Sequence, residues 1–161
     1  MIGSFNFNSS AEIVFGCGVV KHLGETAVKL GSRHMIACDP FCVKSGLAGR
    51  LEKNLKEAGA EVLLYDGVIP NPTVEMIDHG ASLARSFEAD CIIGLGGGSS
   101  IDSAKGIAVS AAHEGSVWDY AIGKKTISAA TLPVIAVTTT SGTGSHCTCF
   151  SVISNNETKQ K

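Results

Sequence analysis

A run of glycines that follows a short apolar segment constrains this chain more than any other feature of its sequence. Residues 91–95 are mostly apolar, residues 96–98 are all glycine, and small apolar side chains then recur every three or four positions. That recurrence predicts a helix that begins close to Ser99. Ser99 followed by Asp102 is a variant of the capping box, a signature of helix starts. The sequence therefore predicts a strand, a glycine loop and a helix. The recurring apolar positions are Ile101, Ala104, Ala108 and Ala111.

A glycine loop at a helix start has a definite chemical use. The free N–H groups of the first turn and the positive end of the helix dipole attract anions. Glycine lets a phosphate approach the backbone without meeting a β-carbon. The alternative is a tight turn that merely needs glycine, but one glycine usually suffices for a turn. Three in a row favour the close approach of a ligand, and a phosphate is the ligand predicted.

The spacing of these glycines does not match the common dinucleotide fingerprint. Counting from Gly94 or from Gly96, the third glycine position holds Ser99 or Ile101. The loop follows a late strand, and no Gly-Lys-Ser or Gly-Lys-Thr follows to make a P-loop. Spacing alone thus predicts a phosphate binder of unspecified kind.

Composition favours one buried parallel sheet. The chain has 161 residues, of which 44 % are hydrophobic, and it can bury one core, so we expect a single domain over residues 1–161. Aromatic residues are few, whereas Gly, Ala, Val and Ile are abundant. That profile is typical of a parallel sheet covered by helices on both faces.

Charge and hydropathy exclude several classes of partner. The net charge is −2 and no basic cluster exceeds Lys124-Lys125, so we expect no nucleic-acid binding. No apolar run approaches membrane-spanning length and no basic-then-apolar leader is present, so we expect no membrane association and a cytoplasmic location. Six cysteines without framework spacing predict reduced, mostly buried thiols.

Strand-like and helix-like segments alternate along the chain. This alternation predicts right-handed βαβ units and a doubly wound, mostly parallel, Rossmann-like sheet. Ligands of such sheets bind beyond the carboxyl ends of the strands. Asp39, Asn71, the glycine loop and a threonine-rich loop over residues 138–145 all follow predicted strands, so we expect them to converge. Strands are expected at 12–15, 33–38, 61–65, 91–95, 132–137 and 150–153, and helices at about 19–30, 41–58, 74–87 and after the glycine loop.

The last eight residues, 154–161, are polar and follow a predicted strand without a further packing element. We therefore expect a ragged end and no second domain.

Together these segments resemble the amino-terminal domain of the iron-containing (group III) alcohol dehydrogenases. The matching pieces are Phe-Gly-Cys-Gly at 15–18, Pro-Asn-Pro-Thr at 70–73, residues 96–105, and residues 139–145. They cover nearly the whole chain in the family's order and spacing. The resemblance implies the cofactor-binding α/β domain without the family's C-terminal helical metal domain.

The resemblance also implies cofactor-binding residues. In the family, the counterpart of the glycine loop holds the pyrophosphate of the nicotinamide cofactor, which assigns that role to Gly97, Gly98 and Ser99, with Asp102 beside the same cofactor. Other matched positions line the adenine, phosphate and ribose sides of the cleft. These are Thr139, Thr140, Thr143, Asn71 and Lys161.

Asp39 has a physical argument of its own. A carboxylate at the end of an early strand can accept both ribose hydroxyls of an adenosine and repel a 2′-phosphate. The alternative is a turn aspartate placed before Pro40. In the family, an aspartate here accompanies NAD, so the resemblance favours the ribose-binding role and NAD as cofactor.

Two departures from the family concern the metal. Where the family has Glu-Val-Thr, this chain has His146-Cys147-Thr148. A soft-metal cluster of His146, Cys147 and Cys149 has poor tetrahedral spacing, and we expect no metal site there. The family's iron, or another divalent metal, is held by residues of a following domain that nothing here matches, so the sequence names no metal ligand and no catalytic residue.

The leading hypothesis is therefore the NAD-binding half of an iron-containing alcohol dehydrogenase, catalytically incomplete by itself. The full-length enzyme would transfer hydride between a small alcohol or aldehyde and the nicotinamide. The surface that meets the second domain should favour self-association, that is, a homo-oligomer. Two alternatives are a fragment of a glycerol dehydrogenase-like or dehydroquinate synthase-like enzyme, and a non-catalytic nucleotide-binding or interaction module.

Overall fold

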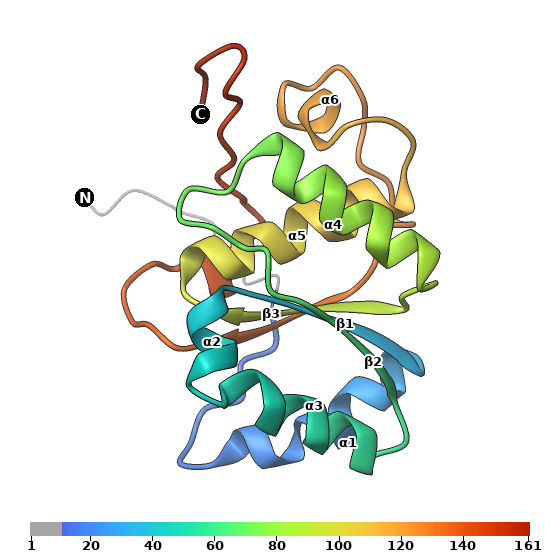
Figure 1. The fold of residues 1–161 in the computed structure, drawn as a ribbon. Coiled ribbons are helices and arrows are strands. Elements are labelled where there is room, and N and C mark those ends of the chain that lie inside the picture. The colour runs from blue at the N-terminus through green and yellow to red at the C-terminus, as the bar shows by residue number, and fades with distance from the viewer. Residues whose placement is uncertain (1–10) are drawn as a thin grey trace, which may run out of the picture.

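The described residues form one parallel sheet of four strands. The computed structural model describes residues 11–161, so the first ten residues of the expected domain lie outside the described part. The strand order is β2-β1-β3-β4. The chain runs from β1 out to β2, returns to β3 on the other side of β1, and continues to β4 (Figure 1). This doubly wound topology confirms the predicted fold class. The strands are β1 (Arg33–Cys38), β2 (Glu61–Tyr65), β3 (Cys91–Gly96) and β4 (Val134–Thr138).

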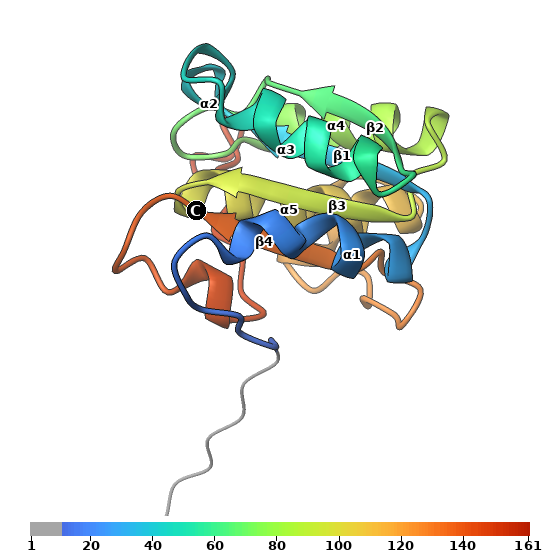
Figure 2. The ribbon, with the colours of Figure 1, turned by 90° about the horizontal axis from the view of Figure 1, so that it is seen from below.

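Helices cover both faces of the sheet. α1 and α3 lie on one face, and α4 and α5 lie on the other, with α6 beyond them (Figure 1). Seen from below, the strands point to one common edge, where the loop after β4 extends outward (Figure 2). The helices are η1 (Val19–His22), α1 (Leu23–Ala27), η2 (Val28–Leu30), α2 (Pro40–Lys44), α3 (Leu47–Glu57), α4 (Val74–Ser86), α5 (Gly98–Ala112), α6 (Val117–Ala121) and η3 (Ser145–Cys147).

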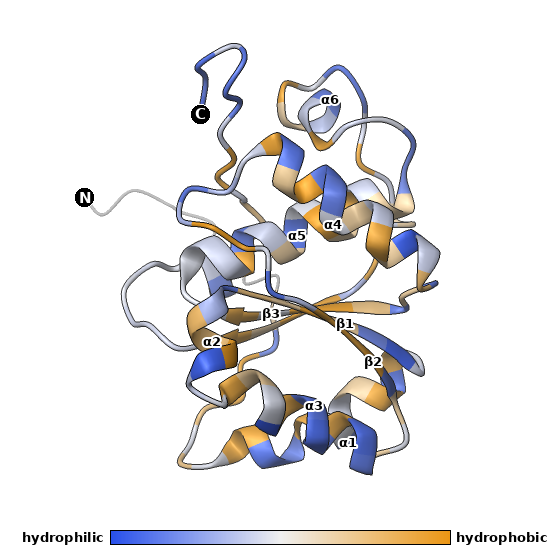
Figure 3. Ribbon diagram, viewed as in Figure 1, coloured by the Kyte–Doolittle hydropathy of each residue, from blue (hydrophilic) through white to orange (hydrophobic). Residues whose placement is uncertain are grey.

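Two apolar clusters lie on the two sides of the sheet. Successive side chains of a strand point to opposite faces, so Met35 packs towards α4 and α5 while Ile36 packs towards α1 and α3. Every residue of β3 is buried, which is expected of a central strand covered on both faces. Apolar residues accordingly follow the strands and the inner faces of the helices (Figure 3). No helix within residues 11–161 is both long and apolar enough to cross a membrane.

Glycine residues, which have no side chain, let α5 pack close to β3 and α4. A β-carbon on Gly94 of β3 would lie 3.0 Å from the β-carbon of Ala104 in α5. A β-carbon on Gly106 of α5 would lie 2.9 Å from Cδ1 of Ile77 in α4. Because such contacts are tighter than side chains normally make, glycine at these positions sets how closely α5 packs on the sheet and on α4.

Most predicted elements are confirmed, but one long helix is divided. The helix expected over 41–58 is present as α2 and α3, separated at Gly46, whose φ is +76°. Glycine adopts this left-handed conformation without strain, so the chain turns there. The short helix α6 was not predicted from the sequence.

Two predicted strands are wrong. Residues 12–15 form no strand, and Phe15 is 96 % exposed. Residues 150–153 form no strand because their backbone binds a helix side chain: the N–H of Val152 donates to the carboxylate of Asp102 at 3.1 Å. An apolar run alone does not reveal that a backbone donor is already engaged in this way.

The polar end packs against the rest of the domain. The N–H of Val74 donates to the carbonyl of Ser154 at 3.1 Å, and the N–H of Ser154 donates to the carbonyl of Pro72 at 2.8 Å. The side chain of Asn155, which is 8 % exposed, accepts hydrogen bonds from two following backbone N–H groups. Ser154 and Asn155 therefore pack on the loop between β2 and α4, whereas residues 156–161 are exposed.

All six cysteines are free, and three of them are buried. Burial raises the pKa of Cys38 and that of Cys91 to about 12, which keeps these thiols protonated and unreactive. Cys17 and Cys149 are exposed. The expectation of mostly buried thiols thus holds for half of them.

His34 is a buried polar side chain in an apolar layer. It is 0 % exposed, and neither ring nitrogen has a hydrogen-bond partner within the described residues. It lies on the same side of β1 as Ile36. Burial lowers the pKa of His34 below its ordinary value of 6.5, against smaller opposing effects of the nearby Gly31 carbonyl and the Asp90 carboxylate. The ring is therefore buried in its neutral form.

We expect the free energy of unfolding to fall as pH drops below 6.5, because the unfolded chain then binds a proton that folded His34 resists. One such group changes stability by up to about 1.4 kcal/mol per pH unit. His34→Leu should remove this part of the acid dependence, as measured by urea unfolding at pH 5, 6, 7 and 8. His22→Gln, at an exposed histidine, is the control. An unchanged pH slope in His34→Leu would contradict the account.

Candidate functional site

The carboxyl ends of β1, β3 and β4 meet at one edge of the sheet. A β-carbon on Gly97 would lie 3.4 Å from the side chain of Thr140, and one on Gly98 would lie 3.3 Å from Thr143. The N–H of Thr139 donates to the carbonyl of Gly96 at 2.9 Å. The threonine loop thus lies directly against the glycine loop, on the side of β4.

The start of α5 carries no side-chain cap. Gly97 occupies the N-cap position, and the first helical bond runs from the N–H of Ile101 to the carbonyl of Gly97 at 3.2 Å. The predicted capping box is wrong, because Asp102 is engaged elsewhere. In a helix of 15 residues, the N–H groups before Ile101 have no side-chain acceptor among residues 11–161. This is the arrangement that binds anions at helix N-termini.

Asp39 lies next to the glycine loop, at the end of β1. Its Oδ1 accepts a hydrogen bond from the N–H of Cys42 at 3.1 Å and so caps α2. Its Oδ2 lies 3.5 Å from the place that a β-carbon on Gly96 would take. One oxygen therefore serves the local turn, as the alternative explanation requires, and the other lies beside the candidate site. The side chain of Cys42 packs beneath, and burial followed by the charge of Asp39 raises the pKa of that thiol.

Asp102 points to a different part of the chain. Its carboxylate accepts hydrogen bonds from the hydroxyl of Ser145 and from the N–H of Val152, the latter at 3.1 Å. Lys105, one turn further along α5, donates to the carbonyls of Ser145 and Phe150, each at 2.6 Å. Burial lowers the pKa of Lys105, and the neighbouring Asp102 opposes that change. The structure thus brings Asp102 to residues 145–152.

Asn71 and Lys161 come together on another loop. The ammonium of Lys161 donates to Oδ1 of Asn71 at 2.7 Å, and both residues are exposed. Asn71 adopts a φ of +55°, which asparagine tolerates better than most residues. The expected convergence is therefore seen for Asp39, the glycine loop and the threonine loop. Asn71 and Lys161 form a second group that includes the chain's polar end.

Sequence reasoning missed several polar residues at this edge. The hydroxyl of Thr138 donates to the carbonyl of Thr140 at 2.7 Å and shapes the threonine loop. Ser100 is 1 % exposed, and its Oγ packs against Gly96. Lys105 and Ser145 connect α5 to the chain beyond the threonine loop. Thr138 and Ser145 lie within the threonine-rich loop, and Ser100 and Lys105 within the matched segment 96–105, but no local spacing assigned a role to their side chains.

The described residues offer no metal centre. Residues 11–161 contain no group of three histidine, cysteine, aspartate or glutamate side chains placed to hold an ion. Nδ1 of His146 is buried without a hydrogen-bond partner in that part of the chain, Cys147 is half-buried and Cys149 is exposed. The described residues therefore do not fit a metal ion.

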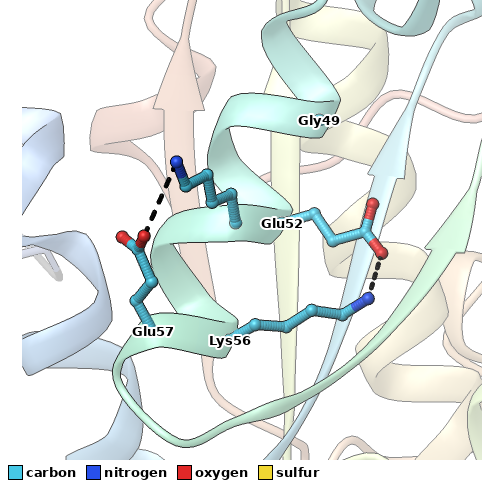
Figure 4. A pocket seen from close by; sticks show the side chains of 5 residues that line it. Gly49, Glu52, Lys56 and Glu57 are labelled. Atoms are coloured by element: carbon cyan, nitrogen blue, oxygen red, sulfur yellow. Dashed lines mark hydrogen bonds and ion pairs between the residues drawn. The ribbon is translucent and has the colours of Figure 1, made fainter.

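A hollow on the outer surface of α3 is a poor candidate for a site. Its lining comes from this one helix, and its charged side chains pair along the helix (Figure 4). Lys56 lies 2.7 Å from Glu52, and Lys53 lies 3.7 Å from Glu57. Pairs of this kind are common on solvent-facing helices and require no ligand.

The fold and the glycine loop define a Rossmann-like α/β domain in which a helix without a side-chain cap begins at the switch point. The chain belongs to the iron-containing alcohol dehydrogenase family, whose family model matches residues 10–161. The resemblance stated from the sequence is therefore confirmed.

Individual relatives agree with this assignment. A choline dehydrogenase of Bacillus subtilis is 41 % identical over 158 residues, which is 96 % of this chain and 39 % of the relative. The structure of an alcohol dehydrogenase from an archaeal halo-thermophile of a Red Sea brine pool matches with a TM-score of 0.91 and 40 % identity, over 98 % of this chain and 42 % of that one. A sulfoacetaldehyde reductase of Bifidobacterium kashiwanohense, solved in complex with NAD+, matches with a TM-score of 0.89 and 31 % identity, over 99 % of this chain and 42 % of that one. This chain spans about two fifths of the length of these relatives.

We expect Gly96→Ala to destabilise the domain by about 2–4 kcal/mol. Gly96 has a φ of +142°, and an added β-carbon would lie 2.4 Å from Oγ of Ser100. Gly49→Ala is the matched control, because nothing lies within 4 Å of its added β-carbon in α3. Alanine there should stabilise the helix by about 0.5–1 kcal/mol. Urea unfolding that gives both variants the same stability would contradict the described geometry of the glycine loop.

Proposed function

We propose that this chain is the NAD-binding part of an iron-containing alcohol dehydrogenase. One observation carries the proposal: the uncapped start of α5 lies at the switch point, with two threonine side chains against its glycines. A dinucleotide's pyrophosphate would bind the N–H groups of Gly98 and Ser99. Its adenosine ribose would then lie towards Asp39. The NAD+ complex of the sulfoacetaldehyde reductase supports the choice of cofactor.

The residues present fit such a cofactor. Gly97 and Gly98 leave a bare backbone surface, and the hydroxyls of Thr140 and Thr143 line it from the opposite loop. Each of these hydroxyls can donate to a phosphate oxygen. In the family, the bound nicotinamide exchanges hydride with an alcohol or aldehyde. This chain's contribution to that reaction would be to bind and orient the dinucleotide.

The proposed role also predicts weak binding by this chain alone. The threonine loop and Asn71 are exposed, so a bound dinucleotide would keep part of its surface in water. The cost of ordering the ligand is unchanged when contacts to that exposed part of the dinucleotide are absent. We therefore propose that the 161-residue chain binds the adenosine and pyrophosphate portion best and catalyses no alcohol oxidation by itself.

Titration calorimetry with NAD, ADP-ribose and AMP tests this function. We expect NAD and ADP-ribose to bind, and AMP to bind more weakly because it lacks the pyrophosphate. Gly98→Val should weaken NAD binding by at least about tenfold, since a branched side chain would occupy the phosphate's place. Binding by neither NAD nor ADP-ribose would refute the proposal and favour a non-catalytic interaction module. If Gly98→Val and the parent chain bind NAD with equal affinity, the glycine loop is only a tight turn and does not bind the phosphate.

Replacing the charge of Asp39 should change the preference between NAD and NADP. We expect Asp39→Gly to lower the ratio of the NADP to the NAD dissociation constant, because the repulsion of a 2′-phosphate is removed. A contact of this kind is worth about 1–3 kcal/mol. Asp39→Asn is the sharper variant, since asparagine caps a helix as well as aspartate and so preserves the bond to Cys42. Glu52→Gln on α3 controls for the lost charge, and an unchanged ratio in Asp39→Asn would contradict the ribose-binding role.

A further inference from the structure

The threonine loop, which lies against the glycine loop, is held at its C-terminal end by three side chains, those of Asp102, Lys105 and Ser145. Residues 139–144 are exposed or half-exposed and contain no helix or strand of their own. The chain becomes buried again at Ser145, which is 7 % exposed. A surface loop with so little support needs a fixed end if its side chains are to hold one position.

Ser145 is bonded to α5 through two charged side chains. Its hydroxyl donates to the carboxylate of Asp102, and its carbonyl accepts from the ammonium of Lys105 at 2.6 Å. Lys105 also lies 3.7 Å from Oδ1 of Asp102, and both of these side chains are largely shielded from solvent. Charge-assisted hydrogen bonds are stronger than neutral ones, and a shielded pair is costly to break.

The same two side chains hold the segment beyond Ser145. Lys105 donates to the carbonyl of Phe150 at 2.6 Å, and Asp102 accepts from the N–H of Val152 at 3.1 Å. Ser151 adds a hydrogen bond from its hydroxyl to the backbone carbonyl of Asp102 at 2.8 Å. Residues 145–152 are thereby fixed along α5, one to two turns after the glycines.

A short relay leads from Ser145 to the candidate site. The N–H of Ser145 donates to Oγ1 of Thr143 at 3.3 Å, and the side chain of Thr143 is the one that lies against Gly98. The position of Thr143 relative to the start of α5 thus depends on a residue that is bonded to α5 itself. Helix α5 therefore provides the free N–H groups of the candidate site and also fixes the position of Thr143 on the opposite side of that site.

We propose that Asp102, Lys105 and Ser145 form an anchor that positions the threonine loop over the start of α5. These are positioning residues that act through Thr143. The consequence for binding rests on the proposed function, whereas the ordering of the loop does not. Asp102 then influences a bound dinucleotide from beneath the loop, without touching it.

Amide hydrogen exchange of the unliganded chain tests the anchor. Lys105→Met keeps the apolar stem and removes the ammonium, so exchange at residues 139–147 should rise by at least about tenfold. Exchange in β1 and β3 should stay as in the parent. Lys53→Met removes an exposed lysine of α3 and is the matched control, with no change expected at 139–147. Unchanged exchange at 139–147 in Lys105→Met would overturn the anchor.

Ser145→Ala is a milder variant that keeps the backbone carbonyl to which Lys105 donates and removes only the hydroxyl. It should raise exchange at 139–147 in the same direction by a smaller factor, and it decides the matter if Lys105→Met fails to fold. ADP-ribose affinity, measured by calorimetry where the variants are fully folded, should fall by about tenfold for Lys105→Met and less for Ser145→Ala.

The two readouts separate this proposal from the proposed function. Faster exchange with unchanged ADP-ribose affinity would refute the positioning role and leave a purely structural contact. A parent chain that binds no ADP-ribose refutes the proposed function, and exchange then still decides whether the anchor orders the loop. Affinity that falls only in proportion to the unfolded fraction would also refute the positioning role.

Discussion

The close packing of α5 on β3 is the constraint on which the rest of this structure depends. Gly94 and Ala104 bring the helix onto the strand because neither carries a side chain longer than a methyl group, and Gly106 does the same against α4. The start of the helix is therefore fixed at the carboxyl end of a strand that is buried along its whole length. Glycines at that junction leave the first N–H groups without a side-chain cap, which is the arrangement we propose to bind the pyrophosphate.

The doubly wound strand order places a segment of the chain on each side of this junction. Because β1 and β4 flank β3, their carboxyl ends place Asp39 on one side of the glycines and the threonine loop on the other. The three segments are far apart in sequence, yet parallel strands that share a sheet must end at the same edge. Asp102 and Lys105 then tie the far end of the threonine loop back to α5. The candidate site is thus formed by the start of α5 and by the segments that follow β1 and β4.

Features of the fold that depend on neighbouring residues alone were predicted from the sequence. Buried strands such as residues 91–95 are mostly apolar runs, and the glycine loop combines a strand end with a helix period, so both were predicted. The capping box failed because Asp102 has partners 43 and 50 positions away, which no local spacing shows. The strand expected at 150–153 failed for the same reason, since its backbone binds that carboxylate. The division at Gly46 was visible as a glycine, but nothing nearby in the sequence required a left-handed turn.

The central claim is that the first turn of α5 binds the pyrophosphate of a dinucleotide. An NMR titration of the ¹⁵N-labelled chain with ADP-ribose, followed at every backbone amide, tests it most directly. The account predicts that the largest shift changes fall on Gly97, Gly98 and Ser99, with smaller ones at Thr140 and Thr143. Shift changes that cluster on another surface and leave these amides unmoved would contradict it.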